Sequence, residues 1–532
     1  MALVQLDFSK GIWDNNENPY DVPIGFSRYM YNWLPDEYGR LGVRYALKDT
    51  LYQASGVTVT PASYGIGMID FNMTTLGTGS SALAGVIWFD PQNSPPSITA
   101  LNKVDGLGNV YNSFAFNYGS PSFAEYNSII YASTLTNGVR KITALNFATA
   151  AITEALVAGS PTQLRGILSF KNRLFGWNNN RVYYTDVPAP GGLPETWNTG
   201  ANFFDVGSSK GTPVIYNILP VENRLYIFTD SGLFSVLVSG PATTWVQRTV
   251  DETIKIFERA ACFVYKNLLY FVDEETIWVS DGVEFKNIGE AVSSTLSKSL
   301  GGNVLKRNKI FRSDNTIIFS RRELIGTVAL GYVKTADLNQ FKWSDIYMWT
   351  DSSFSEILGV INNVSTKDWT TKSSYIMGSL VDVVGTGFED AYLFRKQEPS
   401  IDSIDDQLDS VNIPISCSFE TGFLDFGEPL KYKTLNYVLI ELSAPKELST
   451  QLFPFIYTDQ QSDGGALITM VVPGASNPFY NQVMVKVEGP EVPFKWLQFA
   501  FKTSDQVSIK NIWFDIDLGG MIEPQVYPSK GI

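Results

Sequence analysis

The residue types that most enzymes use for acid–base or nucleophilic chemistry are scarce in this chain. Its 532 residues include no His and only two Cys, Cys262 and Cys417, which lie far apart in the sequence. Without imidazole, neither a Ser-His-Asp triad nor a His-ligated metal site is available. Two isolated cysteines also lack the paired spacing of a zinc site and the density of a disulfide framework. Any catalysis would therefore depend on carboxylates.

One pair of carboxylates has a spacing that could serve chemistry. Asp515 and Asp517 alternate with the apolar residues Phe514 and Ile516, so a strand would place both acids on one face. Such a pair could act as acid and base or bind a cation. It could also be the solvated side of an amphipathic strand, which this alternation usually indicates. No other group converges with the pair in the sequence. We therefore expect no enzyme activity, no catalytic residue, no cofactor and no metal ligand.

A second acidic stretch fails as a calcium site. Asp14, Asn16 and Asn18 match the first ligand positions of an EF-hand loop. The loop would then need Gly where Pro19 stands and Glu where Gly25 stands, so the match is lost. No phosphate-binding loop of the form G-x-x-x-x-G-K-[ST] is present either. The stretch is better explained as a solvated turn.

Composition points to a β protein without affinity for phosphates. The chain has 40 Lys plus Arg against 54 Asp plus Glu, a net charge of −14, and 14% aromatic residues. An excess of acidic residues argues against a protein that binds nucleic acid by neutralising its phosphates. A composition rich in aromatic residues favours β-strands. The N-terminal residues lack the pattern of a secretory signal, and no apolar run is long enough for a membrane helix. We expect a protein made in a reducing compartment and not inserted in a membrane.

A recurring hairpin phrase is the strongest structural signal. It consists of an Asn, an apolar-aromatic strand, a polar tip and a second strand, as in Asn172–Trp177 followed by Arg181–Asp186. The marker Asn recurs at positions 127, 172, 223, 267 and 315, giving spacings of 45, 51, 44 and 48 residues. A period of about 40–50 residues with several strands per unit is typical of a β-propeller blade.

The repeats therefore predict an all-β fold containing a β-propeller over residues 51–398. Outer copies at 84–89, 374–380 and 391–394 bring the count to about seven blades. A set of ordinary hairpins packed in sandwiches is the alternative. Residues 1–50, rich in Asn, Asp, Pro and Tyr, predict an N-terminal extended arm. Apolar and polar residues alternate along several segments of residues 411–532, and this pattern predicts a C-terminal β-sandwich-like domain.

Three phrases resemble a known family, the β-propeller tail nozzle proteins (tail tubular protein B and related tail-accessory stabilisation proteins) of short-tailed bacteriophages. The first lies at 8–44 and ends in Gly39-Arg-Leu-Gly-Val-Arg44. The second runs from Phe170-Lys-Asn-Arg-Leu-Phe-Gly176 through Pro194-Glu-Thr-Trp197 to Asn223-Arg-Leu-Tyr-Ile-Phe228. The third is Glu420-Thr-Gly-Phe-Leu-Asp-Phe-Gly427. They occur in the family's order from end to end.

This resemblance implies a structural virion protein, assembled in the host cytoplasm and located in the tail. It implies a ring, typically a homohexamer, below a tail adaptor and in contact with fibres or a needle. The genome would pass through the lumen during ejection without specific binding. The alternative from another class is a propeller that binds carbohydrate for host recognition. A glycoside hydrolase or lyase would need a carboxylate cluster that the sequence does not assemble.

Two further expectations concern surfaces. An acidic lumen would repel DNA and let it slide, although −14 could equally be a solubility charge. The aromatic loops 186–197 and 343–349 are predicted contacts for subunits or fibres, because Trp and Tyr dominate interface hot spots. Pro188, Pro190 and Pro194 would stiffen the first loop. If that loop only covers a core, replacing Trp197 should unfold the monomer.

Overall fold

The protein is described here by a computed structural model. It describes residues 2–6, 10–11, 13, 22–23, 26–35, 41–43, 47–57, 68–72, 84–90, 97–103, 109–115, 122–134, 136–146, 151–209, 211–273, 276–293, 308–313, 316–321, 327–333, 341–345, 354–365, 372–381, 389–396, 406–408, 411–413, 415–444, 450–459, 470–472, 481–489, 493–503 and 508–521.

Strands dominate the described residues, and most belong to four-stranded antiparallel units that follow one another along the chain. The first three units are β6–β9 (Met68–Asn72, Ala84–Asp90, Ser97–Lys103, Asn109–Ala115), β10–β13 (Ser122–Tyr126, Ile129–Ser133, Val139–Asn146, Ala151–Leu156) and β14–β17 (Gly166–Phe170, Arg173–Asn178, Arg181–Tyr184, Phe203–Asp205). The next three are β18–β21 (Ile215–Val221, Arg224–Thr229, Gly232–Leu237, Gln247–Asp251), β22–β25 (Cys262–Tyr265, Leu268–Val272, Ile277–Ser280, Phe285–Asn287) and β26–β29 (Asn308–Ser313, Thr316–Arg321, Thr327–Val333, Phe341–Asp345).

A seventh unit closes the series with a strand from the opposite end of the chain. It contains β30 (Phe354–Ser365), β31 (Lys372–Val381) and β32 (Glu389–Lys396), and its fourth strand is β5 (Leu47–Val57). β5 pairs antiparallel with β32, and Lys396 lies opposite Leu47. Two short strands, β33 (Asp406–Leu408) and β34 (Val411–Ile413), extend this sheet beyond β5. The closing strand thus joins two segments more than 300 residues apart.

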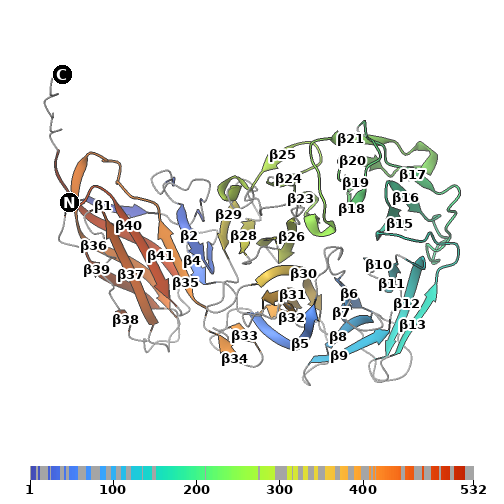
Figure 1. Cartoon of the computed structure of the whole chain (residues 1–532), viewed down its shortest axis with the longest axis horizontal. Helices are drawn as coiled ribbons and strands as arrows, with labels where there is room; N and C mark the ends of the chain where they lie inside the picture. Colours follow the sequence, from blue (N-terminus) through green and yellow to red (C-terminus); the bar gives the residue numbers. More distant parts are fainter. Residues whose placement is uncertain are drawn as a thin grey trace.

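The seven units form a ring (Figure 1). Their first strands contact one another in the order β6, β10, β14, β18, β22, β26, β30, and β30 returns to contact β6. This circle of innermost strands, with each later strand farther out, is the architecture of a β-propeller. The predicted all-β propeller of about seven blades is confirmed, and the units are called blades one to seven below.

The marker residues Asn127, Asn172, Asn223 and Asn267 lie in the turn between the first and second strands of their blades, and the fifth marker, Asn315, lies outside the described residues. In blade two Asn127 and Ser128 have φ values of 50° and 61°. Lys171 and Asn172 have 47° and 57°, and Lys266 and Asn267 have 49° and 62°. Two successive residues with positive φ define the type I′ turn that matches the twist of paired strands. Asn tolerates this left-handed conformation better than most residues, which explains its recurrence in these three turns. In blade four the residue with positive φ is Glu222, at 52°, instead of Asn223.

Neighbouring blades bury shared apolar clusters and exchange a few hydrogen bonds. Phe175 and Trp177 of blade three pack with Ile218 and Phe234 of blade four. The Asn308 side chain of blade six donates to the Asp273 carbonyl of blade five at 2.8 Å. No blade could shield these surfaces alone, so each depends on its neighbours.

The C-terminal domain is a sandwich of two sheets. One contains β1 (Ala2–Leu6), β3 (Trp33–Pro35), β4 (Leu41–Val43), β36 (Lys431–Ala444), β39 (Asn481–Glu488) and β41 (Ser508–Met521). The other contains β2 (Ser27–Tyr31), β35 (Cys417–Thr421), β37 (Thr450–Thr458), β38 (Met470–Val472) and β40 (Leu497–Thr503). The first is called sheet one and the second sheet two.

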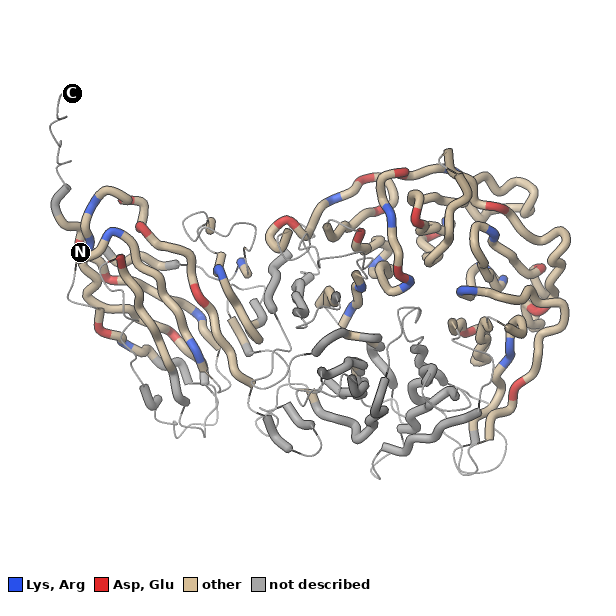
Figure 2. The backbone as a smooth tube through the Cα atoms, viewed as in Figure 1, with Lys and Arg blue, Asp and Glu red and all other residues tan. Residues whose placement is uncertain are grey.

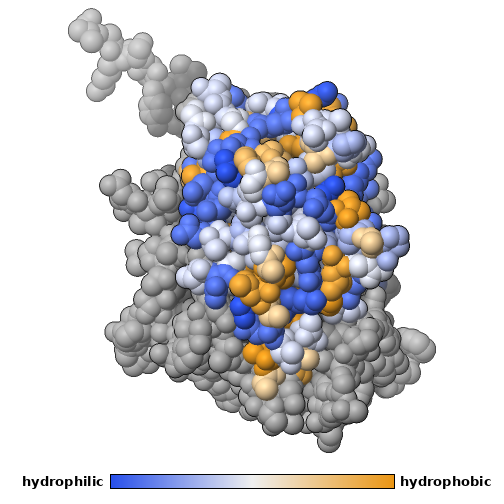
Figure 3. Space-filling model, turned by 90° about the vertical axis from the view of Figure 1, so that its right-hand side faces the viewer, coloured by the Kyte–Doolittle hydropathy of each residue, from blue (hydrophilic) through white to orange (hydrophobic). Residues whose placement is uncertain are grey.

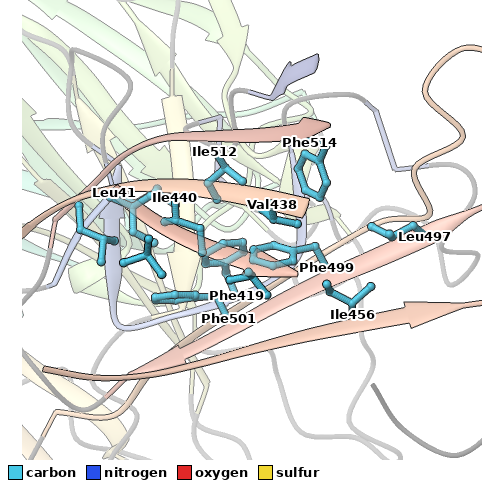
Figure 4. Packing of buried hydrophobic residues seen from close by; sticks show 14 of the residues in the cluster. Leu41, Phe419, Val438, Ile440, Ile456, Leu497, Phe499, Phe501, Ile512 and Phe514 are labelled. Atoms are coloured by element: carbon cyan, nitrogen blue, oxygen red, sulfur yellow. The ribbon is translucent and has the colours of Figure 1, made fainter. Parts of the chain in front are cut away.

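Alternating residues of the two sheets meet in a dense core (Figure 4). Val438, Ile440, Ile512 and Phe514 extend from sheet one, and the rings of Phe419, Phe499 and Phe501 extend from sheet two. Because side chains in a strand alternate between faces, the residues between them point outward on both sides. The sandwich therefore presents two outer faces separated by one core.

The first 50 residues do not form one separate arm. Strands β1 to β4 pair within the sandwich, and β5 begins at Leu47 in the propeller. The physical reason is burial, because Met30, Trp33 and Leu41 fill the sandwich core. β2 also pairs in parallel with β29 of blade six, through Tyr31 and Asp345. The sheet of blade six is thus continuous with sheet two, and β34 at the predicted start of the C-terminal domain pairs with β33 instead.

Candidate interaction surfaces

The two cysteines are structural. Cys262 and Cys417 are both free and buried. Burial raises the pKa of the Cys262 thiol, so it stays protonated and unreactive at neutral pH. The Cys417 Sγ lies 3.5 Å from the Asn32 carbonyl inside the sandwich, where it behaves as a small apolar group.

The carboxylates considered from sequence are neighbours on the outer face of sheet one. Asp515 is buried and Asp517 is exposed. The Asn436 side chain donates to Asp517 at 3.2 Å and lies 3.5 Å from Asp515, and this hydrogen bond lowers the pKa of Asp517. Within the described residues, no group of three His, Cys, Asp or Glu side chains is placed to hold a metal ion. The pair belongs to an outer face of the sandwich.

The loop 186–197 between blade-three strands is anchored at both ends. The Asp186 amide donates a hydrogen bond to the Thr196 carbonyl at 3.0 Å. Thr185 and Trp197 are paired in an isolated antiparallel β-bridge. Trp197 is only 8% exposed and packs with Tyr131 and Val139 of blade two. The loop thus covers the core between blades two and three, and Trp197 is not available as a surface anchor.

A polar contact fixes the same loop to blade two. Glu195 accepts a hydrogen bond from the Tyr131 hydroxyl at 2.7 Å. It also forms an ion pair with Lys141 at 2.8 Å. The pKa of Tyr131 is raised, first by burial and then by the Glu195 carboxylate. Pro194 beside it is buried. These contacts hold the stem of the loop rigid and leave its tip at the surface.

The outer edges of blades two to four offer little continuous apolar surface. Val187, next to the anchored Asp186, is 53% exposed and Leu156 on β13 is 49% exposed. Figure 3 shows the side of the molecule where these blades lie, and its hydrophobic patches are small and separated by hydrophilic residues. Scattered apolar residues of this kind are normal on a soluble surface.

The outer face of sheet one, called the acidic face, is rich in carboxylates. Glu441, Glu488, Asp515 and Asp517 point to it, together with the cationic Lys486. Lys486 pairs with Glu488 at 2.8 Å and lies over the Tyr437 ring at 4.7 Å. Exposed apolar residues lie beside the charges, with Leu3 at 57% and Met484 at 53% exposure.

The outer face of sheet two, called the aromatic face, carries rows of rings. Tyr29 and Tyr31 stand side by side on β2 with ring centroids 6.2 Å apart and planes 9° apart. Phe455 and Tyr457 repeat this on β37, at 6.4 Å and 8°. The sequence pattern carried this signal, since Tyr29/Tyr31 and Phe453/Phe455/Tyr457 alternate with core residues. The predicted extended arm over residues 1–50 does not include this face, because Tyr29 and Tyr31 join the sheet only through the pairing of β2 with β35.

Cations lie over the rings of the aromatic face. The Arg28 guanidinium is 5.0 Å from the Tyr29 ring, and the Lys502 ammonium is 5.4 Å from the Phe455 ring. Glu420 lies between them, 3.7 Å from Arg28, and accepts a hydrogen bond from Gln498 at 2.8 Å. Burial raises the pKa of Glu420. Charges of both signs occur on the propeller and on the sandwich (Figure 2).

Several predicted positions lie outside the described residues. They include Asp14, Asn16, Asn18, Pro19, Gly25 and residues 346–349. Trp343 lies on β29, with only its backbone described. None of the helices in the described part of the chain is long and apolar enough to cross a membrane.

Comparison with known proteins supplies a likeness in fold alone. No family model matches the chain, and no curated protein matches it. It is similar to YCF48 bound to D1 peptide, with 10% identity, a TM-score of 0.34, and coverage of 64% of this chain and 100% of that one.

Two further solved structures show the same weak likeness. The extracellular domain of a one-component system from B. thetaiotaomicron is 11% identical with a TM-score of 0.39, covering 89% of this chain and 61% of that one. The Chaetomium thermophilum Nup170 NTD–Nup53 complex is 10% identical with a TM-score of 0.32, covering 74% and 66%. Scores this low carry no functional argument, and the β-propeller fold of this chain rests on its own strand pairing.

Proposed function

We propose that this chain is a structural subunit of the tail of a short-tailed bacteriophage, forming part of a nozzle ring through which the genome leaves. In this proposal the chain has no enzymatic role. Its partners are further copies of itself, expected as a homohexamer, a tail adaptor above the ring, and fibres or a needle. It is assembled in the host cytoplasm and resides in the virion.

The observation that carries this proposal is where the family-like phrases lie. The Asn172 phrase forms the first turn of blade three, and Trp197 of the Pro-Glu-Thr-Trp phrase fills the space between two blades. The Glu420–Gly427 phrase covers the end of β35 and the following turn in the sandwich. If the resemblance extends over the whole architecture, the similar sequence segments should lie at turns and at contacts between blades, where they determine the fold. A binding loop grafted on an unrelated propeller would not require them.

The charge of the chain is compatible with a channel part. At −14 overall, a wall built from such subunits repels the phosphate backbone, so DNA passes without being held. The acidic lumen remains a prediction, because one chain alone does not enclose that channel.

Imaging and binding assays together test the proposal. We expect antibodies raised against the purified chain to label the tails of intact phage particles and to leave heads unlabelled in negative-stain images. Absence of the chain from purified particles would contradict the proposal. The carbohydrate-binding alternative predicts specific signals on a glycan array, and such signals from a protein absent from tails would replace our proposal with that one.

A further inference from the structure

We propose that the acidic face of the sandwich in one copy contacts the aromatic face of the sandwich in the next copy. This inference rests on the proposed ring function, since it names the surfaces that join the subunits. It assigns the C-terminal domain the task of linking copies head to tail.

The first step is the composition of the acidic face. Leu3 and Met484 are more than half exposed there and stand beside the carboxylates of the same face. They flank the carboxylates of Glu441, Glu488 and Asp517. Apolar residues mixed with charges of one sign are suited to a partner that is both apolar and oppositely charged.

The second step is the composition of the aromatic face. Tyr29 is 40% exposed, and Tyr31, Phe455 and Tyr457 are partly exposed. Arg28 and Lys502 lie against these rings at 5.0 and 5.4 Å. Tyr and Arg side chains held in place by stacking lose little entropy on binding, which makes them effective interface anchors.

Charge selects which faces meet. On the acidic face the carboxylates of Glu441, Glu488 and Asp517 reach the surface beside the ammonium of Lys486, and on the aromatic face Arg28 and Lys502 lie beside Glu420. Acidic against acidic would bring six surface carboxylates together, and aromatic against aromatic would oppose its own cations. Only the mixed pairing places unlike charges opposite each other.

The position of the faces then sets the type of assembly. They lie on opposite sides of one buried core, so a copy that uses one face keeps the other free (Figure 4). Such a heterologous contact closes into a ring when the rotation between copies divides the circle, and otherwise extends as a filament. A closed dimer is not expected, because it would require each face to meet itself.

Site-specific cross-linking tests the pairing. Tyr29→Cys on the aromatic face and Met484→Cys on the acidic face are made in separate full-length chains, whose native cysteines are buried. With a short thiol-reactive linker, we expect the mixture of the two variants to give at least tenfold more cross-linked dimer than either variant alone. Val283→Cys, 81% exposed on blade five, is the matched control and should give only background with either partner.

Charge reversal supplies a second readout. Lys502→Glu should weaken self-association at least tenfold in sedimentation velocity, and mixing it with a Glu488→Lys chain should restore part of the loss. Raising the salt concentration should weaken the wild-type contact, because surface charges are screened. Reversal at Lys286, on β25 of the propeller, is the control and should leave association unchanged.

The outcomes separate the two proposals. Cross-links in a single-variant sample, or none above the Val283→Cys background, overturn the face-to-face pairing. If the tails of phage particles are nevertheless labelled by the antibody, the nozzle assignment stands and the subunits join through other surfaces. Binding of a glycan to wild-type protein that Tyr29→Ala abolishes would instead give the aromatic face a carbohydrate as its occupant.

Discussion

At the scale of the residue, large aromatic side chains of this protein pack between neighbouring blades. The sequence predicts a contact role for the loop that ends at Trp197, because Trp and Tyr dominate interface hot spots. The structure buries Trp197 against Tyr131 and Val139. A sequence pattern cannot separate these roles, since a Trp in a loop looks the same whether its ring points outward or under the next blade.

Replacing Trp197 should therefore cost stability. Trp197→Ala leaves a cavity between blades two and three, and we expect a loss of about 3–5 kcal/mol in the free energy of unfolding, measured by urea denaturation. Val187→Ala in the same loop is the control, and its exposed side chain should change stability by less than about 0.5 kcal/mol. Equal stability of both variants would show that the ring is not needed for packing.

Tyr270 predicts a loss of stability in alkaline solution. Its hydroxyl is buried without a hydrogen-bond partner, and burial is the main cause that raises its pKa from 10 to about 12. In the unfolded chain the phenol ionises near pH 10, so this contribution is fully present below pH 10. It is lost as pH rises toward 12, at a cost of about 2–3 kcal/mol.

The variant Tyr270→Phe checks this assignment. At pH 7 it should be as stable as the wild type or slightly more so, because it removes an unsatisfied buried group. Between pH 10 and 12 its denaturation midpoint should fall less steeply than that of the wild type. Tyr29→Phe at an exposed position serves for comparison, and an unchanged slope for Tyr270→Phe would refute the pKa assignment.

At the scale of the element, the sequence predicts the individual hairpins better than it predicts which strands pair over long distances. Apolar-aromatic strands with polar tips predicted the hairpins of blades two to five, and the period predicted a propeller, both from local patterns. The pairing of β5 with β32 and of β2 with β29 could not be predicted, since any exposed strand edge offers the same backbone groups. The outward-facing rings of β2 and β37 are visible in the sequence as alternation, but their placement in one sheet depends on long-range pairing.

The marker turns make a local prediction. Asn267 has φ of 62° in the first turn of blade five. Asn267→Val should destabilise the protein by about 1–2 kcal/mol, because a β-branched side chain resists the left-handed conformation. Asn267→Gly should have the wild-type thermal midpoint or a slightly higher one. Similar losses for both variants would indicate that the Asn side chain, not its backbone conformation, is what the turn requires.

The closing strand of blade seven makes a long-range prediction. Ala54 of β5 lies opposite Ala391 of β32. A disulfide between Ala54→Cys and Ala391→Cys would close a loop of more than 300 residues, and the oxidised protein should gain about 3–5 kcal/mol over its own reduced form. Failure of the two cysteines in the folded protein to form an intramolecular disulfide under oxidising conditions would contradict the pairing of these strands.

At the scale of the whole molecule, the chain ties its two domains together from both ends. Its N-terminal strands complete the sandwich and the last blade, and the sheet of blade six continues into sheet two. Such weaving resists separation of the domains, which the proposed role in a phage tail would require. The nozzle assignment extends this logic from one chain to a ring of copies around an axis.

The central claim is tested most directly by cryo-electron microscopy of the tails of phage particles that contain this chain. We predict a closed ring of copies below the portal region, each with a seven-bladed propeller and a sandwich that touches the sandwich next to it, around a lumen wide enough for duplex DNA. Tails without propeller density in a ring, or the chain found only as single copies at fibre tips, would contradict the account.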